Sequence, residues 1–147
     1  MRVAQNLAGL GASKKHKGVL VGDTIEDVTA TDFTPRGVAL KPFSPTDVTG
    51  YYDGSDFTIS WVRRGRIGQE LVSGLDIPLS EETERYEVDI MDGVSVVRTL
   101  PSLSPSVVYS GAQMTEDWGT SFPDLLTVRV YQLSATVGRG YYIEVVL

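Results

Sequence analysis

Short runs of alternating apolar and polar residues, separated by turn-forming residues, dominate the chain after Pro45. In the runs 57–61 and 86–90 every second residue is apolar, so each run has one apolar and one polar face. This pattern is typical of strands that cover a core with one face. The predicted core residues of the two strands are Phe57, Ile59, Trp61, Tyr86, Val88 and Ile90.

A tight hairpin is predicted where Asp92 and Gly93 follow the second run, because Gly93 supplies the positive φ that such a turn needs. Residues 94–100 form the returning strand. Further strands are predicted at 107–110, at 126–133 and at 141–147, and Val128 and Val130 join the core. Helical periodicity is nearly absent. The sequence therefore predicts an all-β chain, with a two-layer antiparallel β-sandwich over residues 44–147 that the last strand completes.

The first 43 residues have a different character and are predicted to form an N-terminal extension. Residues 1–18 are rich in Gly, Ala, Ser and Lys, which favours an arm that orders only on a partner. Residues 19–21 and 24–30 are expected to add one or two short strands before Pro35 and Pro42 interrupt backbone pairing.

Charge and cysteine content exclude several function classes. The formal net charge is -6, and the first 20 residues are basic, so the remainder is more acidic still. An acidic body argues against nucleic-acid binding, which depends on clustered Lys and Arg. The chain has no Cys, which fits assembly in a reducing cytoplasm. No apolar run has the roughly 20 residues needed to span a bilayer, so no membrane insertion is expected.

Several residues together resemble a fibronectin type III domain. They are the lead-in Pro45, the Trp of the second strand in 57–61, the run 86–90, and Val128-Arg129-Val130 followed by Gly138-Arg139-Gly140. The resemblance implies that Trp61 packs between the sheets and that Gly138 and Gly140 form the corner between the last two strands. The Tyr that usually opens the sixth strand is replaced here by Leu126.

Four longer segments carry a narrower resemblance. They are RGVALKPFSP (36–45), WVRRGRIG (61–68), IPLSEETERYEV (77–88) and VYQLSATVGRG (130–140). Together they are similar to the carboxy-terminal region of the large tail-tip, or host-specificity, protein of gene transfer agents and related long-tailed phages. In that family the region ends a far longer polypeptide.

The narrower resemblance implies a non-enzymatic structural component of the tail tip, which contributes to tail assembly and host-surface attachment. The implied location is the virion, after assembly in the host cytoplasm. The implied partners are other tail-tip proteins, such as hub and host-specificity proteins, in a multi-subunit assembly, with a host surface glycan as a further ligand. One alternative is a stand-alone carbohydrate-binding module for host polysaccharide, and a second is a glycan-cleaving enzyme.

An arginine-rich loop is the first candidate binding site. Arg63, Arg64 and Arg66 concentrate positive charge, and guanidinium groups hold carboxylates bidentately. The loop is expected either to contact anionic sugars or an acidic subunit, or to pair internally with nearby acids. Those acids are Glu81, Glu82 and Glu84.

Aromatic residues at strand ends and in one loop form the second candidate set. Tyr51 and Tyr52 precede a turn, and Tyr141 and Tyr142 open the last strand. Adjacent residues of a strand face opposite ways, so one residue of each pair is expected to meet solvent or a partner. Trp118 is expected either to stack on a sugar or to fold over the sandwich edge. The candidate binding residues from this set are Tyr51, Tyr52, Trp118 and Tyr142.

No catalytic residue, metal or cofactor is predicted. Residues 53–56 lack the remaining ligands of a calcium loop and are predicted to form a turn. His16, the only histidine, lies among lysines with no nucleophile or orienting carboxylate nearby in sequence. The acidic pairs Glu81-Glu82 and Glu116-Asp117 carry no geometric information until a cleft is seen.

Overall fold

The computed structural model describes residues 7–66, 79–120 and 122–147. The chain divides into two compact units, Met1–Ala39 and Leu40–Leu147. The division lies a few residues before the boundary expected after residue 43. A 3-10 turn, η2 (Val38–Leu40), spans it.

The first unit contains a 3-10 turn, η1 (Leu7–Gly9), and a two-stranded antiparallel ribbon of β1 (Lys14–His16) and β2 (Thr31–Phe33). Lys14 therefore belongs to a strand that pairs within the chain, whereas an arm ordered only by a partner was expected. The His16 and Phe33 rings meet edge to face at 5.6 Å.

The prediction of strands at 19–21 and 24–30 was wrong. These residues lie between β1 and β2 and form turns and bends. Their printed backbone hydrogen bonds are local, from Asp23 N to Leu20 O at 3.1 Å and from Asp27 N to Thr24 O at 3.2 Å. Gly22 has a φ of 104°, which favours a turn over a continuing strand.

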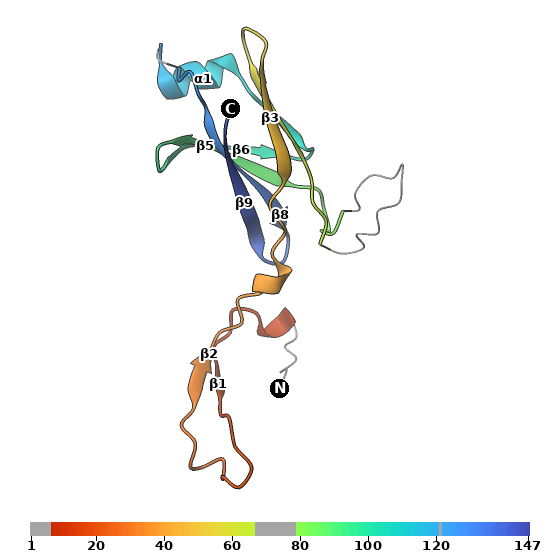
Figure 1. Cartoon of the computed structure of the whole chain (residues 1–147), viewed down its shortest axis with the longest axis vertical. Coiled ribbons are helices and arrows are strands. Elements are labelled where there is room, and N and C mark those ends of the chain that lie inside the picture. The colour runs from red at the N-terminus through yellow and green to blue at the C-terminus, as the bar shows by residue number, and fades with distance from the viewer. Residues whose placement is uncertain (1–6, 67–78, 121) are drawn as a thin grey trace. The chain divides into compact units, whose positions relative to one another are not determined.

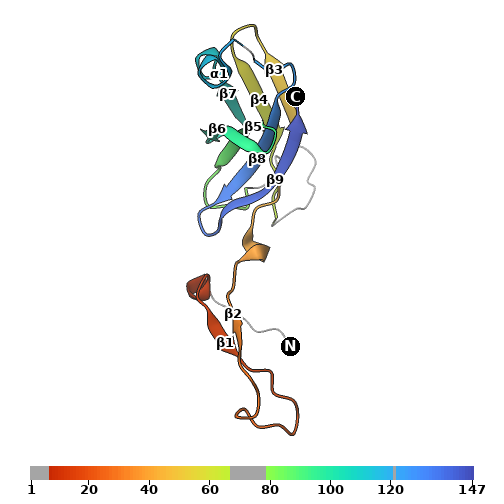
Figure 2. The ribbon, with the colours of Figure 1, turned by 90° about the vertical axis from the view of Figure 1, so that its left-hand side faces the viewer.

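The second unit is a sandwich of two antiparallel sheets, which face each other in Figure 2. The three-stranded sheet has the order β3-β4-β7, and the four-stranded sheet has the order β6-β5-β8-β9. The strands of the four-stranded sheet are labelled in Figure 1. The elements in chain order are β3 (Thr46–Tyr52), β4 (Phe57–Val62), β5 (Tyr86–Asp92), β6 (Ser95–Ser102), β7 (Ser106–Tyr109), α1 (Gly111–Trp118), β8 (Thr127–Ser134) and β9 (Gly138–Val146).

The core lies between the two sheets and contains the residues expected there. Trp61 is 5% exposed, and its ring meets the ring of Tyr86 edge to face at 5.1 Å. Phe57 is half-buried and packs against the rim of the core. The buried members from the predicted set are Ile59, Trp61, Tyr86, Val88, Ile90, Val128 and Val130. Alternation along the sequence thus indicates which face of these strands is buried.

The predicted hairpin is confirmed, but its second strand begins one residue later than expected. Asp92 pairs with Ser95, so the turn consists of Gly93 and Val94, and Gly93 has a φ of 58°. The returning strand begins at Ser95 and continues through Pro101 to Ser102. Because β6 is an edge strand, the missing N–H of Pro101 interrupts no pairing on its outer side.

The helix α1 was not predicted. Ser110 accepts a hydrogen bond from Gln113 N, and Gln113 Oε1 accepts one from Ser110 N, which is a capping box. The strand expected over 107–110 therefore ends at Tyr109, because Ser110 becomes the N-cap. The spacing of Ser110 and Gln113 was the signal in the sequence. Within the described residues no helix has the length and apolar character needed to cross a membrane.

The glycines of the last hairpin have separate structural reasons. Gly138 begins β9 with a φ of 71°, three residues before the predicted start of that strand. At Gly140 an added Cβ would lie 2.6 Å from Pro42 O and 2.9 Å from Gln132 O. The absent side chain lets Tyr141 N donate to Pro42 O at 3.0 Å, so the lead-in segment lies against β9.

Leu126, which stands where fibronectin type III domains usually have Tyr, is buried in the core immediately before β8. Its backbone N–H and C=O each bond to Leu147 at 2.9 Å. The apolar contact is therefore kept, and a backbone pair with the last residue secures this corner.

Candidate functional site

The arginine-rich loop after β4 is held mainly by acids of the same chain. Arg66 donates from Nε and Nη2 to the two carboxylate oxygens of Glu81, at 2.7 and 3.2 Å, and its backbone N donates to Ser80 Oγ at 2.9 Å. Arg63 Nη1 donates to Glu84 Oε1 at 3.2 Å. The side-chain hydrogen bond to Glu81 is the largest contribution that raises the pKa of Arg66. Two of the three predicted binding arginines thus take part in internal ion pairs.

Arg64 differs from its neighbours because it is exposed and its guanidinium lies 5.3 Å from the ring centroid of Phe43. It keeps its charge toward solvent while covering an aromatic face. The parts of the resemblance at Ile67 and Gly68 and at Ile77 and Pro78 lie outside the described residues.

The carboxylates considered for acid-base chemistry are also engaged in structural contacts. Glu81 holds Arg66, and Glu82 accepts a hydrogen bond from Thr136 Oγ1 at 3.2 Å. Glu116 and Asp117 both accept from Arg98. These groups join separate elements of the fold. Among the described residues, no cluster of three or more His, Cys, Asp or Glu side chains could hold a metal.

Residues 53–56 form the predicted turn between β3 and β4. Asp53 Oδ1 accepts hydrogen bonds from Ser55 N and Asp56 N, both at 2.8 Å, and the bond from Asp56 is the first cause of the lowered pKa of Asp53. Asp56 Oδ1 in turn accepts from Gly111 N at 2.8 Å. The turn is thereby fastened to the start of α1.

Trp118, the last residue of α1, folds over the sandwich edge. Its Nε1 donates to the hydroxyl of Tyr109 at 2.8 Å, and that hydroxyl donates to Asp117 Oδ2 at 2.6 Å. Asp117 also accepts from Arg98 Nε at 2.6 Å and from Arg98 Nη2 at 2.7 Å. Because the polar atom of the indole has an internal partner and its ring packs against the core, this geometry favours a structural role for Trp118.

The Asp117 network makes stability depend on pH. The Arg98 guanidinium is the main cause that lowers the pKa of Asp117 below its usual value near 4. A lowered pKa in the folded state adds stability above the unfolded pKa, and this stability is lost as pH falls through the folded value. We expect Asp117→Asn to lower the free energy of unfolding by about 1–2 kcal/mol at neutral pH, and the difference from the wild type to shrink below pH about 4.

Urea denaturation of both proteins between pH 7 and pH 2 checks this dependence. Asp92→Asn is the matched control, since Asp92 is an exposed carboxylate at the end of β5. A constant gap between Asp117→Asn and wild type across the whole range would contradict the proposed role of the charge.

The four paired tyrosines are all substantially exposed, where one of each pair was expected to be. Tyr51 is 69% and Tyr52 53% exposed, and Tyr141 and Tyr142 are 47% and 50% exposed. The ammonium group of Lys41 lies over the Tyr141 ring, with Nζ 5.7 Å from the ring centroid. The ring of Tyr142 packs against the ring of Tyr131 on the outer face of the four-stranded sheet, with centroids 5.4 Å apart.

That outer face carries a buried ionic contact which the sequence reasoning missed. Asp89, 1% exposed, accepts from Arg139 Nη1 at 2.6 Å and Nη2 at 2.9 Å, and from Thr99 Oγ1 at 2.6 Å. The Arg139 guanidinium lies 4.3 Å from the ring centroid of Tyr131. The alternation in β5 marked Asp89 only as a polar, outward residue.

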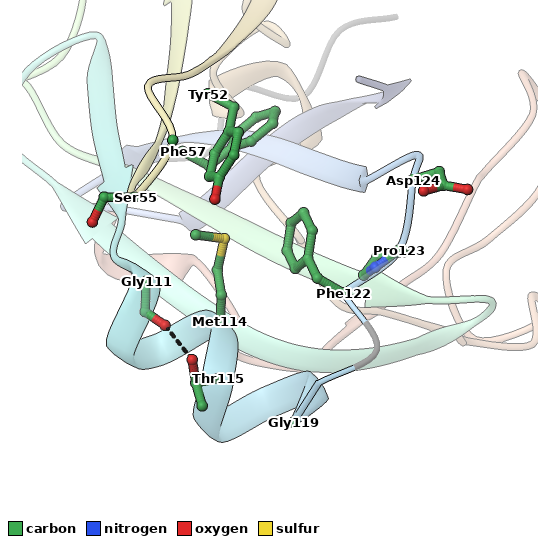
Figure 3. Close-up of a pocket in the computed structure, with 11 residues that line it drawn as sticks. Tyr52, Ser55, Phe57, Gly111, Met114, Thr115, Gly119, Phe122, Pro123 and Asp124 are labelled. Carbon is green, nitrogen blue, oxygen red and sulfur yellow. Dashed lines mark hydrogen bonds between the residues drawn. The ribbon is translucent and has the colours of Figure 1, made fainter.

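A pocket of about 440 Å³ opens at the end of the sandwich where the β3–β4 turn, α1 and residues 122–124 meet (Figure 3). Tyr52 and Phe57 stack at 6.5 Å on one side, Met114 lies at the base, and Phe122 stands on the other side. Of the described lining residues, Tyr52 alone had been named as a binding candidate. The others come from three separate segments, and no local motif groups them.

Comparisons with known proteins found structural likeness without sequence likeness. No protein-family model matches the chain, and no curated protein matches it in sequence. The rat CD45 extracellular region, domains d3-d4, is similar with a TM-score of 0.50 and 11% identity, over 100% of this chain and 68% of that one.

Two further solved structures are similar at lower scores. The Clostridium perfringens spore cortex lytic enzyme SleM has a TM-score of 0.46 and 14% identity, over 89% of this chain and 36% of that one. The FN5 domain of Drosophila Lar has a TM-score of 0.39 and 14% identity, over 72% of this chain and 94% of that one.

These comparisons bear on fold alone. The sheet orders of the second unit and the likeness to the CD45 domains confirm the predicted fibronectin type III-like β-sandwich. Because one fold serves many functions, the function has to be argued from the residues themselves.

Proposed function

We propose that this chain is a non-enzymatic structural component of the tail tip of a phage or gene transfer agent, where it contributes to tail assembly and to host-surface attachment. The proposal starts from the four segments that resemble the tail-tip family, at 36–45, 61–68, 77–88 and 130–140. Its main support is the way in which the described residues of these segments contact one another.

Each of the four segments contacts another at one end of the sandwich. Arg64 of the second segment lies over Phe43 of the first, and Arg66 is paired with Glu81 of the third. The fourth segment reaches the third through Thr136 and Glu82. It also lies against the first, because a Cβ added at Gly140 would come within 2.6 Å of Pro42 O.

The spatial clustering matters because the four segments are far apart in sequence. Segments inherited together as one structural unit are expected to be joined by ion pairs and backbone contacts, as the described residues of these four are. This observation carries the proposal.

Two exposed aromatic side chains on edge strands of the sandwich support a binding role. Tyr51 on β3 and Tyr142 on β9 are at least half exposed, and aromatic residues are enriched at protein interfaces. Single small domains bind weakly, so many contacts in a multi-subunit tail would supply the avidity for attachment.

Labelling of intact particles tests the placement. We expect an antibody raised against residues 40–147 to mark the tail tip in electron micrographs, and particles produced without this chain to bind no antibody. Particles lacking the chain should also adsorb poorly to host cells. Label on the capsid, or no label on particles that contain the chain, would refute the placement.

A further inference from the structure

The pocket in Figure 3 has walls suited to the flat apolar face of a ring. Tyr52 is 53% and Phe122 37% exposed, so both rings remain accessible, while Met114 is nearly buried beneath them. Phe122 is supported from behind by Trp118, with ring centroids 6.5 Å apart and planes at 86°. The volume of about 440 Å³ lies in the ~300–1,000 Å³ range of small-molecule sites.

The charge of the lining restricts the ligand class. Among the described residues that line the pocket there is no Lys or Arg, and one of them, Asp124, is acidic. The chain as a whole has a formal charge of -6. Anionic ligands such as phosphates or uronic acids would therefore meet repulsion without a cation to pair with. A neutral ligand is favoured.

Polar groups at the rim favour a sugar over an apolar amino-acid side chain as the ligand of the pocket. Thr115 Oγ1 donates to Gly111 O at 2.8 Å and keeps its lone pairs as acceptors, and Ser55 also lines the pocket. An apolar side chain would remove water from these groups and from Asp124 without replacing their hydrogen bonds, which costs free energy. A sugar supplies hydroxyl groups for the rim and C–H faces for the aromatic walls.

We propose that this pocket binds a neutral sugar ring, held between Tyr52 and Phe122 with its hydroxyl groups directed to the polar rim. The inference deepens the attachment role and rests on that proposed function only for the source of the sugar, the host surface. The choice of ligand class rests on the lining residues.

Titration of the full chain with D-glucose, D-galactose, D-mannose and N-acetylglucosamine, followed by amide chemical shifts in NMR spectra, tests the inference. At least one of these sugars is expected to bind in the millimolar range, with shift changes concentrated at the pocket. D-glucuronic acid, the probe for charge, is expected to bind more weakly than glucose. The absence of any shift change with all four neutral sugars would overturn the proposal.

Variants of the two aromatic wall residues test whether the sugar binds in this pocket. Tyr52→Ala and Phe122→Ala are each expected to weaken binding about tenfold, because each removes one stacking surface. Tyr141→Ala is the matched control, since Tyr141 is 47% exposed, is not among the lining residues of the pocket and was not named as a binding residue, and it should leave affinity unchanged. Equal losses in Tyr52→Ala and Tyr141→Ala would overturn the site. Tighter binding of N-acetyltryptophanamide than of any sugar would instead indicate a peptide-docking pocket and overturn the ligand class.

The two proposals fail separately. Tail-tip labelling in particles whose chain binds no sugar would refute only the pocket. Sugar binding at the pocket in a chain located on the capsid would refute only the tail-tip placement.

Discussion

Removal of residues 138–147 is expected to abolish cooperative folding of the sandwich. These residues form β9 and the last residue of the chain, and β9 pairs with β8 from Thr127 to Ser134. Their loss leaves one edge of β8 without its backbone partners and removes the apolar contacts of Ile143 and Leu147 with the core. Domains are stable by only about 5–15 kcal/mol, so losing one of the seven sandwich strands among the described residues exceeds what the rest can sustain.

Urea denaturation followed by circular dichroism and tryptophan fluorescence measures this effect. The full chain is expected to unfold in one cooperative transition of the sandwich, and the shortened chain in none. Removal of Met1–Ala39 is the control, because that longer deletion takes away a separate compact unit and keeps all strands of the sandwich. A cooperative transition near the full-length midpoint after removal of 138–147 would show that β9 is dispensable.

Trp61→Ala is expected to lower the free energy of unfolding by about 3–5 kcal/mol, as large-to-small changes of buried aromatic residues do. The indole is 5% exposed and packs edge to face on Tyr86 across the two sheets. Its removal leaves a cavity at the point where β4 contacts β5, and neighbouring side chains fill such a cavity only in part.

Two variants of the same strand calibrate this result. Val62→Ala changes the next residue, which faces outward and is 42% exposed, and should alter stability by less than about 0.5 kcal/mol. Trp61→Phe keeps an aromatic ring in place and should be intermediate. A Trp61→Ala protein as stable as Val62→Ala would show that the indole is not a central part of the core.

Much of the sandwich could be read from the sequence because the relevant signals are local. Alternation in residues 57–61 depends only on the two-residue period of a strand, and it marks Ile59 and Trp61 as buried wherever the strand lies. Gly93 marks the hairpin for the same reason, since its positive φ is a property of one residue. Local signals also misled at 19–30, where β-type residues found no sheet to join.

Some local signals were present but outweighed. The helix α1 has only eight residues, too few for a convincing helical period, yet its capping box of Ser110 and Gln113 was visible in the sequence. The strand expected to include Ser110 took precedence because β-type runs surrounded it.

The sequence by itself determined which side of most strands is apolar and where one hairpin turns, because these depend on residues one to three positions apart. The succession of such runs along residues 44–147 predicted the β-sandwich. Only the tertiary structure decided that Arg66 pairs with Glu81, that Trp118 donates to Tyr109, and that Tyr52 and Phe122 share a pocket. Each of these contacts joins different segments or element ends. Their meeting is set by strand register and by the packing of α1 against the sheets, which no periodicity along the chain encodes.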